Sequence, residues 1–243
     1  MKFCVSLTTI PSRLKTIHKT INSINAQIVK PNKIFLSIPY NYKRFKEKID
    51  ENYLKNLNLD NVKIIRCEDF GPSTSFLGPL NEIINNYEFM IIVNDDHIYD
   101  KNITEIMIRN YKKEQINYSF YLQKIFDIKM AQTADAFLIK TNLIFNAYRF
   151  YKTIVENNKN LRMDDDLWIS IYLQKIMKSK IKNLINEFKK ITNKKIIYTV
   201  HTTTDSLIHT THKRKVFWNR RKIAKYELIK FKIKNYFNKF NII

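Results

Sequence analysis

Short apolar runs alternate with amphipathic stretches along the first hundred residues of the chain. The apolar runs, each of a length that suits a buried strand, are residues 2–10, 33–38, 62–67 and 88–93. The stretches between them, which we predict to be helices, are residues 12–24, 42–57 and 77–86. Strands that alternate with helices in this way predict a mostly parallel sheet covered by helices.

The alternation continues in the second half of the chain. The expected strands are residues 118–125, 136–139 and 195–200. The expected helices are residues 103–111, residues 141–155 and a stretch that follows the acids at 164–166. From about Val216, apolar residues recur every three or four positions beside a lysine face, which predicts an amphipathic helix. We therefore expect an α/β domain at 1–212 and a basic, helical C-terminal extension at 213–243.

The net charge of +21 is concentrated near the end of the 243-residue chain. Residues 1–174 hold 24 basic and 19 acidic side chains, whereas residues 175–243 hold 19 basic and 3 acidic ones. The first part has the charge of an ordinary globular domain. The basic end could bind phosphates, nucleic acid or an anionic membrane surface, so a nucleic-acid-binding protein is one open alternative.

The sequence lacks the signals of a membrane-spanning or disulfide-rich protein. Its longest apolar run, residues 89–93, is far shorter than the ~18 residues of a membrane-spanning helix. Polar residues follow the first strand too soon for a secretory signal peptide. Two cysteines, Cys4 and Cys67, make neither a disulfide framework nor a zinc cluster. We therefore expect a cytoplasmic protein.

Polar residues gather where the predicted strands end. Thr8 and Thr9 lie at the end of the first strand, residues 69–71 follow the third, and residues 94–96 follow the fourth. The carboxyl ends of parallel strands lie at one edge of a sheet, which is where such sheets bind ligands. We expect the functional site at this edge.

The turn Asn94-Asp95-Asp96 carries two carboxylates and an amide. Such hard oxygen ligands bind Mg²⁺ or Mn²⁺, with the phosphates of a substrate completing the coordination shell. The alternative is a solvated turn that caps the helix beginning at Ile103.

The triplet Asp164-Asp165-Asp166 places three acids at the start of a helix. Acids stabilise helix N-termini by ~0.3–1 kcal/mol each, so capping is one explanation. Three adjacent carboxylates also repel one another, so at least one is expected to have a raised pKa, as a general base requires.

Five segments of the chain, taken in order, resemble the family-two-like glycosyltransferases, and most of all their small bacterial and large-virus members. The segments are residues 5–13 (VSLTTIPSR), 30–34 (KPNKI), 71–74 (GPST), 93–99 (VNDDHIY) and 164–170 (DDDLWIS). The resemblance implies the GT-A fold, a Rossmann-like mixed sheet flanked by helices. It also implies a nucleotide-diphosphate sugar as donor, with a UDP-sugar favoured, and Mn²⁺ or Mg²⁺ as cofactor. The implied reaction is an inverting transfer to a hydroxyl of a glycan or lipid-linked glycan.

The resemblance also implies roles for individual residues. Asp96 would be the chief metal ligand, with Asp95 in support. Asp165 or Asp166 would be the general base, and we favour Asp165. The residues implied to face the nucleotide or its phosphates are Thr8, Arg13, Gly71, Thr74, Asn94 and Asp95.

Three histidines, His201, His209 and His212, fit no zinc pattern, and a polar loop would also explain them. The resemblance implies closure of the site from the C-terminal side, so we expect His209, ahead of the other two, to reach the diphosphate or the metal. Two positions depart from the family: Asn94 replaces a third acid, and Ser75 replaces a common lysine. A sugar-nucleotide-binding protein without catalytic activity is therefore a second alternative.

The extension at 213–243 has two possible places. Its lysine face suits an anionic membrane or a partner, and its apolar stripe could equally pack on the domain. We do not expect it to bind nucleic acid specifically.

Overall fold

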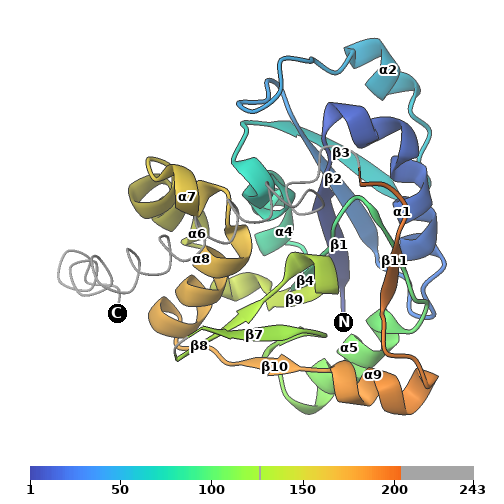
Figure 1. Cartoon of the computed structure of the whole chain (residues 1–243), viewed down its shortest axis with the longest axis vertical. Coiled ribbons are helices and arrows are strands. Elements are labelled where there is room, and N and C mark those ends of the chain that lie inside the picture. Colours follow the sequence, from blue (N-terminus) through green and yellow to red (C-terminus); the bar gives the residue numbers. More distant parts are fainter. Residues whose placement is uncertain (126, 204–243) are drawn as a thin grey trace.

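The protein is built around a seven-stranded sheet in a computed structural model that describes residues 1–125 and 127–203 (Figure 1). The strands of this sheet are β1 (Phe3–Thr8), β2 (Lys33–Pro39), β3 (Val62–Cys67), β4 (Phe89–Ile92), β6 (Asn117–Ser119), β9 (Phe137–Lys140) and β10 (Ile181–Asn183). Their order across the sheet is β10-β6-β9-β4-β1-β2-β3. Strands β1 to β4 are mutually parallel, and β9 is antiparallel to both of its neighbours. The predicted mixed α/β sheet is thereby confirmed.

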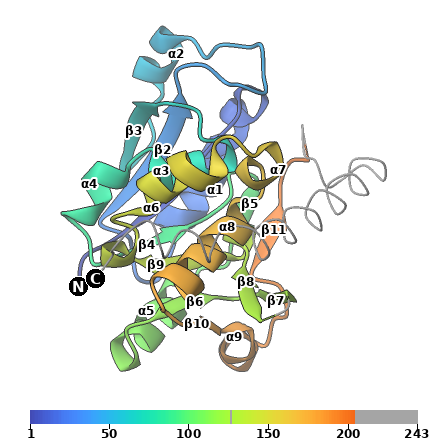
Figure 2. The same ribbon diagram turned by 90° about the vertical axis from the view of Figure 1, so that its left-hand side faces the viewer.

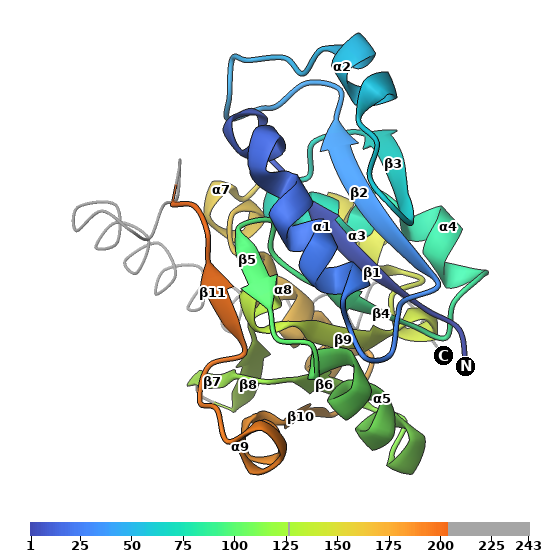
Figure 3. The ribbon, with the colours of Figure 1, turned by 90° about the vertical axis from the view of Figure 1, so that its right-hand side faces the viewer.

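Helices cover both faces of the sheet (Figures 2 and 3). One face packs against α1 (Ile17–Asn25), α2 (Glu51–Asn56), α5 (Ile103–Lys113) and α9 (Ile185–Thr192). The other face packs against α3 (Thr74–Leu77), α4 (Leu80–Ile84), α6 (Ala147–Phe150), α7 (Lys159–Arg162) and α8 (Asp165–Ile171). Short 3₁₀ turns at Pro11–Thr16, Gly71–Ser73, Thr133–Asp135 and Thr141–Leu143, and π turns at Tyr151–Val155 and Tyr172–Ile176, complete the helical elements.

Strand β4 is apolar along its whole length because it contributes to two cores at once. Successive side chains of a strand point to opposite faces. Met90 and Ile92 of β4 therefore belong to the core under α8, whereas Phe89 and Ile91 belong to the core under α1 and α5. This explains why the run at 88–93 reads as a fully buried strand.

Two small antiparallel ribbons flank the main sheet. One pairs β5 (His97–Tyr99) with β11 (Tyr198–Val200), which lie side by side in Figure 3. The other is the hairpin of β7 (Leu122–Ile125) and β8 (Ile128–Ala131). The first ribbon brings the late part of the chain to the acidic turn, where the His201 amide donates a hydrogen bond to the Asp96 carbonyl at 2.9 Å.

The predicted helix at 42–57 is wrong for its first half, because only α2 is helical there. The residues before α2 are held by contacts with other strand ends. The Tyr42 hydroxyl donates to the Thr9 carbonyl at 3.0 Å, and the Lys43 amide donates to the Asp69 carboxylate at 2.6 Å. These long-range bonds take the place of helical hydrogen bonds.

The single strand predicted at 118–125 is also wrong, because the structure divides it between two sheets. Tyr118 and Ser119 pair with β9, whereas Leu122 begins the hairpin with β8. Between them Tyr121 is exposed, and the Ser119 hydroxyl donates to its carbonyl at 3.0 Å. This local turn separates the two strands.

Several predictions fall on residues that the structure does not describe. These are the sites His209 and His212, the extension at 213–243 and its helix from Val216. Among the helices of residues 1–203, none is long and apolar enough to cross a membrane.

Candidate active site

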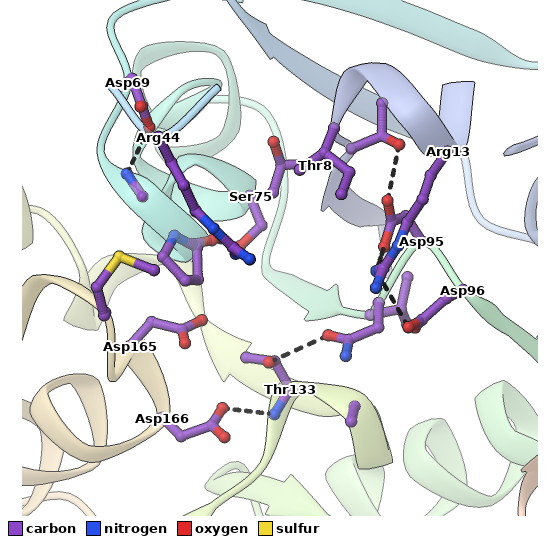
Figure 4. Close-up of a pocket in the computed structure, with 18 of the residues that line it drawn as sticks. Thr8, Arg13, Arg44, Asp69, Ser75, Asp95, Asp96, Thr133, Asp165 and Asp166 are labelled. Carbon is purple, nitrogen blue, oxygen red and sulfur yellow. Dashed lines mark hydrogen bonds and ion pairs between the residues drawn. The ribbon is translucent and has the colours of Figure 1, made fainter. Parts of the chain in front are cut away.

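A cavity of about 510 Å³ opens at the carboxyl ends of the four parallel strands. It is lined at or just after the ends of β1, β2, β3 and β4, respectively, by residues 8–10, by Pro39, by Asp69, Gly71 and Pro72, and by residues 93–97. The opposite wall comes from residues 132–134 and 162–166. Figure 4 shows the two walls facing each other, with Asp95 and Asp96 on one side and Asp165 and Asp166 on the other. The acidic clusters at 94–96 and 164–166, far apart in the sequence, therefore share one cavity.

Arg13 holds the carboxylates of the acidic turn. Its Nη1 lies 2.8 Å from Asp95 Oδ1 and 3.0 Å from Asp96 Oδ2. The Thr9 hydroxyl donates to the other oxygen of Asp95 at 2.7 Å, and His97 pairs with the other oxygen of Asp96. Both aspartates are buried, with 6% and 5% of their surface exposed. Their negative charge is therefore matched locally.

The two carboxyl groups of the turn differ in pKa. Burial raises the pKa of Asp95 although Arg13 is adjacent. Burial acts in the same direction on Asp96, but the hydrogen bond and charge of His97, with the charge of Arg13, outweigh it and lower the pKa of Asp96. Asp96 is thus the more readily ionised carboxylate of the two.

Backbone contacts fix the shape of the acidic turn. The Thr20 hydroxyl of α1 donates to the Asp95 carbonyl at 2.8 Å. The Asn94 amide donates to the Tyr99 hydroxyl at 2.9 Å, and that hydroxyl donates to the Ala134 carbonyl at 3.1 Å. The turn is thus held between α1 and the opposite wall of the cavity.

The second acidic cluster is held differently, at the start of α8. Asp164 occupies the N-cap position, yet its side chain makes no capping hydrogen bond. The Thr133 amide donates to Asp166 Oδ1 at 2.8 Å. Burial raises the pKa of Asp165 well above its usual range, and the charges of Asp166 and Asp164 add to this effect. The expected carboxyl with a raised pKa therefore exists, and it is Asp165.

A further carboxyl that the sequence analysis did not identify lies behind this wall. Burial, with the charge of Asp166, raises the pKa of Asp135 to about 7. Asp135 closes the 3₁₀ turn that also carries Thr133. A second carboxyl, next to the acidic wall, therefore also has a raised pKa.

Gly71 gives the turn after β3 its shape. Its φ of +66° lies in the left-handed region, which side chains other than glycine rarely adopt. Its amide donates to Asp69 Oδ1 at 2.7 Å, while Asp69 Oδ2 accepts the Lys43 amide. Asp69 therefore links the loop after β2 to the turn after β3.

The residues predicted to face the nucleotide are placed as follows. Thr8, Arg13, Gly71, Asn94 and Asp95 line the cavity, but Thr74 does not. The buried Thr74 hydroxyl instead accepts a hydrogen bond from the Phe70 amide at 2.9 Å. Thr74 therefore supports the turn rather than the cavity wall.

His201 also lies outside the cavity lining. Its Nε2 is 3.0 Å from the Thr20 hydroxyl, on the α1 side of the acidic turn. Burial lowers the pKa of His201. This histidine therefore packs behind the turn rather than against the space for a diphosphate.

The cavity has further lining residues that sequence reasoning missed, chiefly Lys43, Arg44, Thr133, Arg162 and Tyr198. In Figure 4 the Arg44 side chain extends from the Asp69 side towards the middle of the cavity. Lys43 and Arg44 lie in a basic stretch, so nothing in the sequence separated them from solvated lysines. Thr133 becomes visible only through its bonds to Asp166 and to Asn94 Oδ1, the latter 3.4 Å long.

Asp95 and Asp96 suit a hard divalent cation only in part. Among residues 1–125 and 127–203, no group of three His, Cys, Asp or Glu side chains could hold a metal. A carboxylate offers about four acceptor sites, and Asp95 and Asp96 each use two of them here. Magnesium-type sites commonly take one or two carboxylates and complete their shell with substrate phosphates and water. Asp95 and Asp96 could therefore supply only part of such a coordination shell.

No family model matches the sequence, and no curated protein matches it. Solved structures do match the fold. Residues 1–349 of S. aureus TarS align with a TM-score of 0.55 at 14% identity, over 98% of this chain and 75% of that one. The TarS complex with UDP aligns with a TM-score of 0.52 at 14% identity, over 100% of this chain and 76% of that one. A cytidylyltransferase from Leptospira borgpetersenii aligns with a TM-score of 0.53 at 12% identity, over 93% of this chain and 94% of that one.

These likenesses establish the fold and no more, because all the identities are low. The neighbours have GT-A-like or nucleotidyltransferase folds. The expected GT-A architecture is therefore confirmed for the described part of the chain.

Proposed function

We propose that this protein is an inverting glycosyltransferase that moves a sugar from a nucleotide-diphosphate sugar to a hydroxyl acceptor. A UDP-sugar is the favoured donor, and a glycan or lipid-linked glycan is the favoured acceptor. The observation that carries the proposal is the shared cavity: Asp95 and Asp96 line it at the end of β4, and Asp165 and Asp166 line it from α8. Sugar transfer needs both a cationic centre for the leaving group and a base for the acceptor.

The wall after β4 suits the donor. Mn²⁺ or Mg²⁺ held chiefly by Asp96 would act as a Lewis acid towards the diphosphate leaving group. Arg13 keeps Asp95 and Asp96 in place through its two short contacts. Thr8, Gly71 and Asn94 line the adjoining part of the cavity, where the nucleotide would lie.

The wall at the start of α8 suits the acceptor. An acceptor hydroxyl has a pKa far above 7, so a carboxylate must take its proton as the oxygen attacks the anomeric carbon. As the new bond forms, the bond to the diphosphate oxygen breaks and its electron pair leaves with the diphosphate. Asp165 is our choice for the base because its raised pKa gives it a greater proton affinity. Asp166, oriented by the Thr133 amide, is the other candidate.

The alternatives to sugar transfer make distinct predictions. Nucleotidyl transfer, the reaction class of the cytidylyltransferase neighbour, would consume a nucleoside triphosphate and release pyrophosphate. A catalytically inactive binding protein would bind the nucleotide without turnover. A nucleic-acid-binding protein would retain DNA or RNA on a filter with a strong salt dependence.

The first experiment is a thermal-shift screen of the full chain against nucleoside diphosphates, with and without Mn²⁺. A ligand at 100 times its dissociation constant adds about 2.7 kcal/mol to the free energy of unfolding. We expect UDP with Mn²⁺ to give the largest shift, and UDP-sugars to be hydrolysed slowly with release of UDP. Stabilisation only by triphosphates, with pyrophosphate release, would replace the proposal by nucleotidyl transfer. No shift with any nucleotide would overturn it.

We also propose that residues 213–243 contact an anionic membrane, on the basis of their sequence alone. Each basic residue near such a surface contributes about 1 kcal/mol of attraction. The full chain should then co-sediment with anionic vesicles and not with neutral ones, and truncation after Lys215 should abolish this. Absence of binding at low salt would rule out the membrane contact.

A further inference from the structure

Arg162, at the end of α7, is a cation of the cavity wall that neither acidic cluster uses. It lines the cavity beside Asp164, and its Nε is buried without a hydrogen-bond partner in the described structure. Its guanidinium also forms no ion pair with any acid of residues 1–125 and 127–203. Arg162 therefore has unused hydrogen-bonding capacity at the edge of the cavity.

Gly71 allows Arg162 to occupy this position. A Cβ atom at residue 71 would lie 2.8 Å from the Arg162 carbonyl oxygen and 3.7 Å from its Cγ. The end of α7 therefore packs against the turn after β3 at a distance that only glycine permits. The Arg162 amide is bonded within its own segment, to the Asn158 carbonyl at 2.9 Å. The backbone of Arg162 is thus fixed while its side chain lies at the cavity.

A buried donor without a partner is unusual in a folded protein. Most such groups are paired. Because Nε itself is buried, a ligand in the cavity would reach Arg162 through the outer nitrogens of its guanidinium. Guanidinium groups match phosphate oxygens because they present several donors in one plane. An oxygen of a phosphate is therefore the ligand chemistry that Arg162 would recognise.

The other basic side chains of the cavity are engaged elsewhere or exposed. Arg13 is shared between Asp95 and Asp96. Lys43 is exposed and faces Glu156, with 3.9 Å between its Nζ and Oε1. Arg44 is exposed and packs over the Phe45 ring at 4.8 Å. Arg162 is the one of these four whose buried nitrogen has no partner in the described structure.

We propose that Arg162 binds a phosphate of the donor's diphosphate, and that the Gly71 turn exists to position it. The inference rests on the proposed function, since it concerns the donor of that same site. In this arrangement the diphosphate is bound by Arg162 of α7 as well as by residues of the wall after β4. The negative charge that grows on the leaving group is then stabilised by a preorganised donor.

The test is calorimetric titration of the full chain with inorganic pyrophosphate, UDP and uridine. Wild type is compared with Arg162→Gln and Arg162→Lys, and with the control Arg109→Gln on α5, where Arg109 pairs with Glu187 at the surface. We expect Arg162→Gln to weaken pyrophosphate and UDP binding about 10- to 100-fold, as loss of a hydrogen bond to a charged group predicts. Uridine binding should not change, and Arg162→Lys should recover part of the loss.

Thermal unfolding checks the fold of each variant. Arg162→Gln should unfold at or above the wild-type temperature, because it removes a buried donor that has no partner. Equal UDP and pyrophosphate affinities in wild type and Arg162→Gln would overturn the inference while leaving sugar transfer intact. Pyrophosphate binding that depends on Arg162 in a protein that transfers no sugar would retain the subsite and reject the proposed function. A wild type that binds neither ligand would overturn both.

Discussion

The two acidic clusters of the cavity have nearly the same composition and very different surroundings. At the turn after β4, Arg13 lies within 3.0 Å of both carboxylates and His97 pairs with Asp96. At the start of α8, three consecutive acids repel one another, and Asp165 is only 8% exposed. The same side chain is therefore stabilised as an anion on one wall and driven towards its neutral form on the other.

This difference in pKa suits the two acidic clusters to two different roles in sugar transfer, which are holding a cation and accepting a proton. A carboxylate with a lowered pKa, such as Asp96, stays charged and suits a cation. A carboxyl with a raised pKa, such as Asp165, accepts a proton more readily and suits a base. Environment, rather than residue type, sets the role of each acid.

The largest expected effect concerns the wall at α8. Asp165→Asn keeps the shape of the side chain and removes its basicity, so the rate of sugar transfer should fall by about 10²–10⁴ while donor affinity is retained. Asp166→Asn should reduce the rate less, since its amide oxygen can still accept the Thr133 amide. Initial rates of UDP release in the presence of acceptor measure both effects.

The control for this pair is Asp127→Asn, an exposed acid that pairs with Lys175. It should leave the rate unchanged. If Asp165→Asn and Asp166→Asn both transfer sugar at the wild-type rate, the acidic triplet serves only the start of α8.

The next effect concerns the wall after β4, where Arg13→Met would remove the cation and leave two buried carboxylates without it. Breaking one side of a buried ion pair typically costs about 3–5 kcal/mol. Urea unfolding at pH 7 should show a loss of this size. Arg109→Met, which breaks an exposed pair with Glu187, should cost less than about 1 kcal/mol. Equal losses in the two variants would mean that Arg13 does not hold the turn.

A smaller effect, with opposite signs on the two walls, is expected in the pH dependence of stability. Because the folded pKa of Asp165 is raised, its charge destabilises the fold above the unfolded pKa of about 3.9. Asp165→Asn should therefore stabilise the protein at pH 7, within the ~0.5–3 kcal/mol usual for one substitution, and the gain should vanish near pH 4.

Asp96 should behave in the reverse way. Its lowered folded pKa contributes stability above about pH 3.9, and this contribution is lost as the pH falls through the folded value. Asp96→Asn should therefore destabilise the protein at pH 7. Thermal unfolding from pH 4 to 8 compares the two variants directly, and shifts of the same sign at pH 7 would contradict the account.

The sequence predicted much of the architecture. The strand at Val62–Cys67 was predicted with its observed bounds, and the strand at 88–93 contains β4. Strand β4 is buried on both faces, so its apolar run reports its environment directly. Strand β3 lies at the edge of the sheet and is only partly buried, and its alternation of polar and apolar residues still marks it as a strand. The helix at 42–57 failed because Tyr42 and Lys43 are bonded to distant strand ends, which no local pattern records.

Site residues could be predicted only where they stand next to a strand or helix that the sequence pattern itself predicts. The turn at 94–96 and the triplet at 164–166 stood out because each follows or heads a strongly patterned element. Arg162 could not be found in this way, because its position depends on a close approach to Gly71 across 91 residues of chain. Thr133 likewise reaches Asp166 through a fold contact, not through a motif.

The central claim is that Asp96 serves the cation and Asp165 serves as the base. Titration of UDP, with and without Mn²⁺, into wild type, Asp96→Asn and Asp165→Asn tests it most directly. We expect Mn²⁺ to strengthen UDP binding in wild type and in Asp165→Asn, and we expect Asp96→Asn to lose this strengthening. Loss of the Mn²⁺ effect in Asp165→Asn, or its full retention in Asp96→Asn, would contradict it.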